Sequence, residues 1–204
     1  MAPARARDLV TDPAEVPSVG EDGRVLALLD GTHITYRPIQ PEDAAALQRL
    51  HRRLSGHSIY LRFFGAKPEL SDRKAAYFAD VDGVNRFSLV ALDPDHPEEI
   101  IAIVSFYREG NTARAEYAAA VEDRWQGRGL GLALTRALIA ASLRRNVRVF
   151  TGMVLPENTR MLNLLRDMKL PERLRYEDGV ELVEIELPSE NPGYQENHRK
   201  RSGR

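Results

Sequence analysis

The spacing of hydrophobic residues in the first part of the chain predicts two strands followed by two helices. Residues 24–29 and 33–37 each read as a short strand, and the turn dipeptide Asp30-Gly31 between them indicates a β-hairpin. Apolar residues then recur at helical spacing after Pro41, a residue type that suits the first turn of a helix. A second helix is expected over residues 71–79, which begin with a serine suited to capping.

The middle of the chain predicts a meander of three strands and then a helix. The strand-like stretches are separated by turn sequences rich in Pro, Asp, Gly and Asn, and they span residues 86–92, 100–107 and 113–121. Beyond them, apolar residues repeat at about one helical turn, at Leu130, Leu134, Leu138 and Ala141.

The C-terminal part predicts a strand, a helix and a last strand. Residues 147–154 are apolar at nearly every position, as expected for a strand buried on both faces. Pro156 then opens a helix that carries an apolar stripe. Residues 182–187 alternate apolar and acidic side chains, which indicates a half-exposed terminal strand.

Composition indicates one domain with a tail at each end. The chain has 204 residues, of which 43% are hydrophobic, so it is long enough to bury a good core. No shift in composition divides it, and we expect a single domain over residues 21–187. Residues 1–20 and 188–204 lack a hydrophobic period and are expected to be disordered, the second tail being basic.

Charge and residue usage exclude several classes of protein. The formal net charge of −1 provides no general attraction for nucleic acid, and no apolar run approaches the length of a membrane span. The absence of cysteine excludes disulfides, thiolate metal sites and a cysteine nucleophile. The five histidines lack metal-ligand spacing, so no metal site is expected. No signal peptide is recognisable, and a cytoplasmic location is expected.

A glycine-rich loop is the strongest chemical signal in the chain. Gly127, Gly129 and Gly131 lie between a predicted strand and a predicted helix. Glycines let several N–H groups point into one concavity, and the helix that follows adds the positive end of its dipole. The loop therefore predicts a pyrophosphate site. Its spacing fits neither a dinucleotide-binding Rossmann turn nor a P-loop.

This loop and the order of elements around it resemble the GNAT superfamily of acyl-CoA-dependent N-acyltransferases. Gln126, Gly129 and Gly131 match the family's (Gln/Arg)-x-x-Gly-x-(Gly/Ala) signature, and Asn158 matches its second common element. The resemblance covers roughly residues 30–187. It implies an α/β fold in which about four helices flank a mixed, mostly antiparallel sheet of six to seven strands.

A narrower resemblance lies upstream of the meander. The segment from Ser55 to Phe64 is similar to the Ser-x-x-Ser-x-Tyr-x-Arg-Phe-Phe stretch of bacterial Pat-type protein lysine acetyltransferases, as is the sequence around Glu116. This resemblance implies transfer of an acetyl group from acetyl-CoA to a lysine side chain of a protein, by direct attack in a ternary complex. It also implies acyl-CoA synthetases of the AMP-forming class as partners.

The candidate base is Glu116. An amine is protonated at neutral pH, so attack on a thioester needs a group that removes a proton. Glu116 stands in an otherwise apolar strand, where we expect a raised pKa; the alternative is an exposed carboxylate or one paired with Arg114 or Arg108. Glu122 and Asp123 are weaker candidates, and we expect their side chains to point to solvent.

The resemblance assigns the contacts of acetyl-CoA. Val121 is expected to pair with the pantetheine amides, and N–H groups of residues 119–121 to face the developing oxyanion. Asn158 is expected to hold the pantetheine arm, although asparagine also suits a helix cap. Residues 159–168 contain no tyrosine, so no general acid is assigned. The pyrophosphate is expected on the glycine loop, and Arg124 or Arg128 is expected to add positive charge. The cofactor-binding residues expected in and beside this loop are Gln126, Gly127, Arg128, Gly129, Leu130, Gly131 and Leu132.

Substrate contacts are expected from the Pat-like segment. A loop that carries hydroxyls, an arginine and two aromatic rings suits recognition of a protein surface or closure over the acyl group. The alternative is a capped corner with both phenylalanines, Phe63 and Phe64, in the core. The polar candidates are Ser55, Ser58, Tyr60 and Arg62.

Two other functions stay open from the sequence alone. One is a GNAT enzyme that modifies a small amine or a protein N-terminus. The other is a non-catalytic module that senses acetyl-CoA, against which Glu116 argues.

Overall fold

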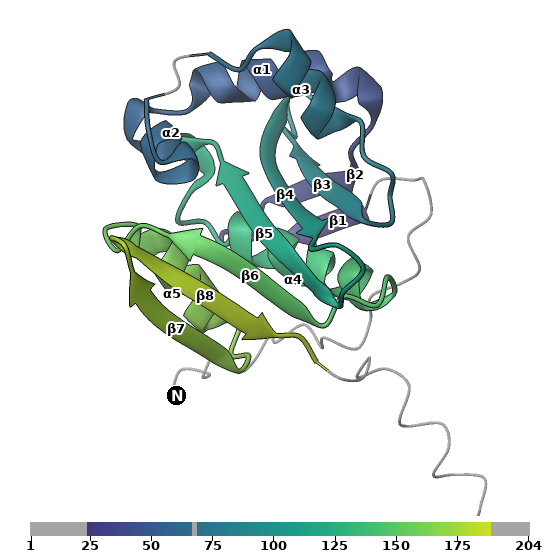
Figure 1. The fold of residues 1–204 in the computed structure, drawn as a ribbon. Coiled ribbons are helices and arrows are strands. Elements are labelled where there is room, and N and C mark those ends of the chain that lie inside the picture. Colours follow the sequence, from purple (N-terminus) through teal and green to yellow (C-terminus); the bar gives the residue numbers. More distant parts are fainter. Residues whose placement is uncertain (1–23, 67–68, 189–204) are drawn as a thin grey trace, which may run out of the picture.

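Eight strands form a single mixed sheet in the computed structural model, which describes residues 24–66 and 69–188 (Figure 1). The strand order is β1-β2-β3-β4-β5-β6-β8-β7. All neighbouring pairs are antiparallel except β5 and β6, which run parallel. The strands are β1 (Arg24–Ala27), β2 (His33–Pro38), β3 (Arg86–Leu92), β4 (Ile100–Arg108), β5 (Arg114–Val121), β6 (Val149–Val154), β7 (Glu172–Glu177) and β8 (Val180–Glu186).

Helices cover the two faces of this sheet unequally. Three of them lie over one face, above β3, β4 and β5 in Figure 1, and two lie on the other face. The first group is α1 (Ala44–Arg53), α2 (Gly56–Phe63) and α3 (Asp72–Ala79), and the second is α4 (Leu130–Leu143) and α5 (Thr159–Asp167). Two short 3₁₀ turns, η1 (Pro41–Asp43) and η2 (Asp123–Trp125), precede α1 and the glycine loop.

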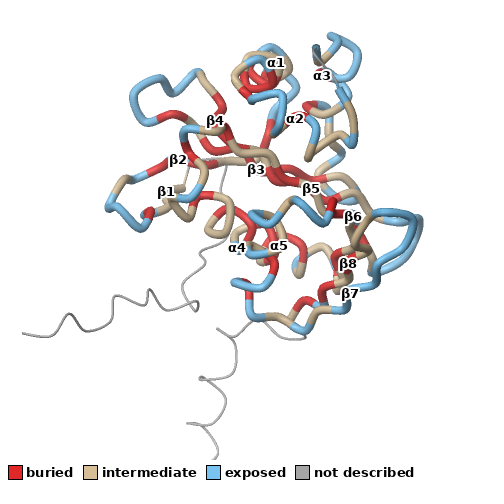
Figure 2. Tube along the Cα trace, turned by 90° about the vertical axis from the view of Figure 1, so that its left-hand side faces the viewer, coloured by how far each residue is buried: buried red, intermediate tan, exposed pale blue. Residues whose placement is uncertain are grey.

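The sheet separates two hydrophobic cores. Along β3, Leu89 and Ala91 belong to the core under α4 and α5, whereas Val90 belongs to the core under α1, α2 and α3. This division follows from the alternation of side chains along a strand. Figure 2 shows that buried positions follow the strands in the middle of the sheet, while the loops at the ends of the elements are exposed.

The parallel pair β5 and β6 is joined over only part of its length. Pairing runs from Arg114 opposite Val149 to Glu116 opposite Thr151. β5 continues to Val121 and β6 to Val154 without pairing to each other, so the two strands splay apart, as Figure 1 shows. The splay leaves one edge of β5 open to a ligand.

The structure confirms the predicted fold class, with more elements than expected. Eight strands and five α-helices are present among the described residues, against six to seven and about four. The hairpin, the meander and the Ser71 cap of α3 are as predicted. Apart from Pro188, the predicted tails lie outside the described residues. No helix of the described part is long and apolar enough to cross a membrane.

Three local predictions need correction. Residues 56–63 form the helix α2 rather than a loop, and the edge strand β7 was not foreseen. β6 is not buried on both faces, because no helix covers its second face there, and Met153 is 57% exposed. α5 begins at Thr159, later than Pro156, because the side chain of Asn158 caps it.

Candidate active site

The glycine loop presents a row of free backbone donors. The N–H groups of six consecutive residues, 127–132, donate to no acceptor in the described part of the chain, and the first bond of α4 runs from Ala133 N to Gly129 O. These donors stand at the N-terminus of a helix of 14 residues, where the helix dipole adds positive charge. The arrangement has donors suited to a pyrophosphate, and the phosphate site itself stays a prediction.

The three glycines of the loop have different roles. Gly127 and Gly129 have φ angles of 74° and 86°, a left-handed conformation that glycine adopts without strain. Gly131 lies inside α4, and a Cβ there would meet the Cδ1 atom of Leu164 at 3.0 Å and the Cγ2 atom of Val121 at 3.6 Å. A side chain at Gly131 would therefore first meet α5 and the end of β5, not the pyrophosphate.

The arginines beside the loop are already neutralised. Arg128 donates to Asp30 at 2.8 Å and to the Thr32 hydroxyl at 2.8 Å, which ties the β1–β2 hairpin to the loop. Hydrogen bonds from Thr32, and then from Arg128, lower the pKa of Asp30 to about 2. Arg124 pairs with Glu122 and Asp93. Contrary to the expectation that one of them adds charge to the pyrophosphate site, both guanidinium groups are engaged elsewhere.

Free backbone groups also line the splay. The N–H of Glu122 donates to Ile101 O on β4. Because successive residues of a strand alternate between its two edges, Ala119 and Val121 direct their N–H and C=O groups toward β6, beyond the point where pairing ends. The Val121 carbonyl accepts from Gln126 Nε2 at 2.8 Å. Their N–H groups face the open edge of β5, and their contacts with pantetheine and an oxyanion stay predictions.

Glu116 lies at the point where β5 and β6 separate. It is the last residue of β5 paired with β6, and it stands opposite Tyr107 on β4. Its carboxylate forms no hydrogen bond or ion pair with the described residues, and its side chain is exposed. The apolar setting predicted from the strand sequence is therefore absent, because the side chain lies outside the stretch of this face, at Ala118 to Ala120, that α1, α2 and α3 cover.

The proposed pairing partners of Glu116 have other contacts. Arg114 pairs with Glu109 and with Glu184, the latter at 2.5 Å. Arg108 donates to Asn85 and to backbone carbonyls. The Glu116 carboxylate is thus open to an incoming substrate.

Glu122 and Asp123 do not point to solvent, which corrects the sequence-based expectation. Glu122 is 5% exposed and is held between Arg53 and Arg124. Asp123 accepts hydrogen bonds from Ser55 N, Ser55 Oγ and Ser58 Oγ at 2.8–2.9 Å. Burial raises the pKa of the Asp123 carboxyl, but these hydrogen bonds outweigh burial, and the pKa lies below its ordinary value.

Two of the predicted substrate residues therefore hold α2 in place. Ser55 caps α2 by accepting from Ser58 N at 3.1 Å. Ser58 in turn accepts from Gln126 Nε2 at 3.2 Å, and Gln126 accepts from Arg160 on α5. Gln126 thus links α2, the end of β5 and α5 around the splay, and it does so through its side chain.

Asn158 caps α5 and keeps its amide hydrogens free. Its Oδ1 atom accepts from Met161 N at 3.1 Å, which is the helix-cap role recognised as an alternative. The Nδ2 atom donates to none of the described residues. The amide can therefore cap the helix and still donate to a ligand. Of the loop leucines, Leu130 is fully buried, so only its N–H faces a ligand, whereas Leu132 is half-buried.

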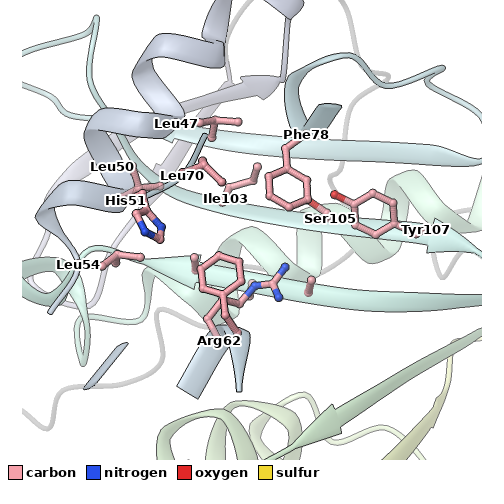
Figure 3. A pocket seen from close by; sticks show the side chains of 14 residues that line it. Leu47, Leu50, His51, Leu54, Arg62, Leu70, Phe78, Ile103, Ser105 and Tyr107 are labelled. Atoms are coloured by element: carbon pink, nitrogen blue, oxygen red, sulfur yellow. The ribbon is translucent and has the colours of Figure 1, made fainter. Parts of the chain in front are cut away.

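A cavity of about 50 Å³ opens on the face of β5 that carries Glu116 (Figure 3). Arg62 on α2 lines it, together with α1 and α3 side chains above and Ala118, Ala119 and Ala120 below. Tyr60 is 41% exposed, and its hydroxyl lies 3.5 Å from Glu157 Oε1, at the far side of the splay. Phe63 packs against the second core as expected, but Phe64 is 42% exposed.

Sequence reasoning missed two tyrosines beside the site. Tyr107 lines the cavity opposite Glu116. Tyr117 faces α4, where its hydroxyl lies 2.8 Å from Thr135 Oγ1, and burial raises its pKa to about 12. The strand alternation around Glu116 could have indicated which face each tyrosine occupies. Among the described residues, no group of three or more His, Asp or Glu side chains is arranged to hold a metal ion.

Comparison with known proteins agrees with this geometry. The chain is 31% identical over 163 residues to the acetyltransferase Pat of Mycolicibacterium smegmatis. The alignment covers 78% of this chain but 47% of that protein. The chain therefore spans about half the length of this curated relative. The solved GNAT domain of S. lividans Pat is 34% identical, with a TM-score of 0.75, and the match covers 81% of this chain and 97% of that domain.

More distant structures share the fold alone. One from Salmonella typhimurium, solved with its cofactor acetyl-CoA, is 16% identical and has a TM-score of 0.61, covering 78% of this chain and 96% of that one. The sequence profile of the Acetyltransferase (GNAT) family matches residues 53–169, which include the glycine loop, Glu116 and the splay. The chain belongs to the GNAT family of acetyltransferases and is related to the Pat acetyltransferases.

Proposed function

We propose that this acetyltransferase moves the acetyl group of acetyl-CoA onto a lysine side chain of a protein, with Glu116 as the general base. The observation that carries the proposal is the position of Glu116. An exposed, unpaired carboxylate stands where β5 and β6 begin to splay, beside free N–H groups of the same strand. If acetyl-CoA binds in the splay, Glu116 would accept the proton and the N–H groups of Ala119 and Val121 would stabilise the oxyanion.

The residues present suit acetyl-CoA. The free N–H groups of residues 127–132 would hold the pyrophosphate, and the open edge of β5 at Ala119 and Val121 would pair with the pantetheine amides. The Asn158 amide would donate to the same arm. When bound, acetyl-CoA supplies the thioester from which the acetyl group is transferred.

The chemistry that remains for the protein is proton transfer and charge stabilisation. The acceptor lysine reaches Glu116 as an ammonium, and the carboxylate takes one of its protons, directly or through water. The neutral amine then attacks the thioester carbonyl, so that a C–N bond forms and the C–S bond breaks. The N–H groups of Ala119 and Val121 stabilise the oxyanion. The amine nitrogen then loses its second proton to water and CoA departs as the thiolate, a group that needs less help than an amine.

The proposed acceptor is an acyl-CoA synthetase of the AMP-forming class. The support is the similarity to Pat acetyltransferases at 31–34% identity, together with the Pat-like segment from Ser55 to Phe64. The exposed, unpaired Glu116 favours an enzyme over a module that only senses acetyl-CoA. A small amine as acceptor is an outcome that the test below can reveal.

One assay tests the proposal. The purified chain is mixed with acetyl-CoA and either an AMP-forming acyl-CoA synthetase or a panel of small amines, and release of CoA is followed. Mass spectrometry then locates any acetylated lysine. We expect CoA release and lysine acetylation with the synthetase. Turnover only with a small amine would contradict the proposed acceptor, and binding of acetyl-CoA without turnover on any acceptor would contradict the enzyme.

A further inference from the structure

The cavity beside Glu116 contains one fixed charge that lacks a partner. Its lining residues are apolar or small except for His51, Ser105, Tyr107 and Arg62, and only Arg62 among them carries a fixed charge. The Arg62 guanidinium makes no hydrogen bond and no ion pair with the described residues. It lies over the ring of Phe63, with its Cζ atom 5.1 Å from the ring centroid.

The guanidinium of Arg62 is partly shielded from water, since the residue is half-buried and lines the cavity. Burial lowers the pKa of Arg62, opposed in part by the nearby Tyr107 and Glu116. Charges that lose part of their hydration in a protein are normally paired, because desolvation without a partner costs free energy. The five N–H donors of a guanidinium match a carboxylate in a two-point contact. The free form of the site thus has a donor set without its acceptor.

The position of the cavity indicates where that acceptor would come from. Side chains of β5 alternate, so Ala118 and Ala120 share a face with Glu116 and form part of the cavity wall. A reacting carbonyl held between Glu116 and the N–H of Ala119 would direct its acyl chain along this wall. In Figure 3 the Arg62 guanidinium lies near the middle of the view, with Leu54 on one side of it and Ser105 and Tyr107 on the other.

We propose that Arg62 binds the terminal carboxylate of a short dicarboxylic acyl group, so that the enzyme also uses acyl-CoA donors such as succinyl-CoA. The methylene groups would contact the alanines of β5 and the leucines of α1, and the carboxylate would meet the guanidinium. Bond changes are those of acetyl transfer: a C–N bond forms, the C–S bond breaks, and the distal carboxylate is unchanged. This inference rests on the proposed acyl-CoA function.

Calorimetry without any acceptor protein tests the proposal. Succinyl-CoA and butyryl-CoA, which have four-carbon acyl groups with and without a carboxylate, are titrated into the parent protein and Arg62→Met. We expect the ratio of succinyl-CoA to butyryl-CoA affinity to fall by about ten- to a hundredfold in Arg62→Met, the range of a charged hydrogen bond. Arg62→Lys, which keeps the charge without the planar fork, should lose less. Arg52→Met, on the exposed side of α1, should leave the ratio unchanged.

Two further readouts keep the test decisive. Arg62→Met should melt no lower than the parent, since it replaces an unpaired charge by an apolar side chain of similar length. If Arg62→Met does not fold, Arg62→Lys serves as the test, and the proposal requires that it lower the ratio of succinyl-CoA to butyryl-CoA affinity. If folded Arg62→Met keeps the parental ratio of succinyl-CoA to butyryl-CoA affinity, the assignment of Arg62 is overturned. The proposed function stands in that case as long as the protein binds acetyl-CoA. Failure to bind acetyl-CoA overturns both.

Discussion

The glycine loop and α2 lie on two sides of the same splay, and they use polar side chains in opposite ways. In the loop, the arginines are paired with Asp30, Glu122 and Asp93, and the free donors are backbone N–H groups. In α2, the serine hydroxyls are bound to Asp123, and the free group is the guanidinium of Arg62.

This difference shows that residue type alone does not identify a binding group. Arg128 and Arg62 carry the same charge, but the partners of Arg128 lie 96 and 98 positions away in sequence. Polar groups inside a fold are nearly always hydrogen-bonded, so the exceptions point to a ligand. The site is therefore defined by the donors that the fold leaves unused.

The largest expected effect on acetyl-CoA affinity concerns the backbone donors of the loop. In Gly129→Val, a β-branched residue at φ 86° is strained, and its Cβ would lie 3.2 Å from Leu29 Cγ. The backbone of the loop should change conformation, so that the N–H groups of residues 127–132 no longer point toward one phosphate site. We expect acetyl-CoA affinity by calorimetry to fall about a hundredfold or more.

A matched glycine separates local strain from loss of the site. Gly179, in the turn between β7 and β8, has a similar φ of 84° and open space around it. Gly179→Val should lower the melting temperature but retain acetyl-CoA affinity. Equal affinity in Gly129→Val and the parent would show that the phosphates bind elsewhere.

The next effect concerns the connection between the two regions. Asp123→Asn replaces a carboxylate that accepts three hydrogen bonds from Ser55 and Ser58 by an amide that can accept fewer. The free energy of unfolding, measured with urea, should fall by about 1–2 kcal/mol. Asp80→Asn, at an exposed position, should change it by less than about 0.5 kcal/mol. Equal stability of Asp123→Asn and the parent would contradict the role of Asp123 in holding α2.

This contribution has a defined pH dependence. The pKa of Asp123 is lower in the folded than in the unfolded state, so its stabilisation is fully present above the unfolded value of about 3.9. It is lost as the pH falls through the folded pKa. The stability gap between the parent and Asp123→Asn should thus be complete at neutral pH and narrow below about pH 4.

The smallest expected effect is on the arginine of the loop. Arg128→Met should change acetyl-CoA affinity by less than about threefold, because the charge is already neutralised by Asp30. Asp30→Asn, which frees that charge, should raise the affinity slightly, and more at low salt. A tenfold loss in Arg128→Met would mean that Arg128 leaves Asp30 to bind the phosphates.

Much of the fold could be predicted because its strands and helices carry clear periods. The helix α4 and the strands β3, β4 and β5 follow from the spacing of apolar residues alone. β7 could not be predicted, since an edge strand that is largely exposed need not alternate. The eight residues of α2 are too few to show a helical period, so the sequence pattern does not distinguish this helix from a loop.

The free backbone donors of the candidate site could be predicted from the sequence, whereas the partners of its side chains could not. The spacing of the glycines indicates free N–H groups, because the conformation of this loop depends mainly on residues that are close in sequence. The contacts of Ser58 and Arg128 depend on residues 65 to 98 positions away, which a single sequence does not bring together. The exposure of Glu116 likewise depends on how far α1, α2 and α3 extend along its face of the sheet.

The most direct test of the central claim is the pH dependence of acetyl transfer by Glu116→Gln. The amide keeps the size of the side chain but cannot accept a proton, so acetyl-CoA affinity should hardly change while turnover at neutral pH falls about 10²- to 10⁴-fold. The account predicts that the rate of the variant rises with pH where the parent has levelled off, because more acceptor lysine is then already neutral. Parental turnover at neutral pH in the folded variant saturated with acetyl-CoA would contradict the assignment of Glu116 as the base.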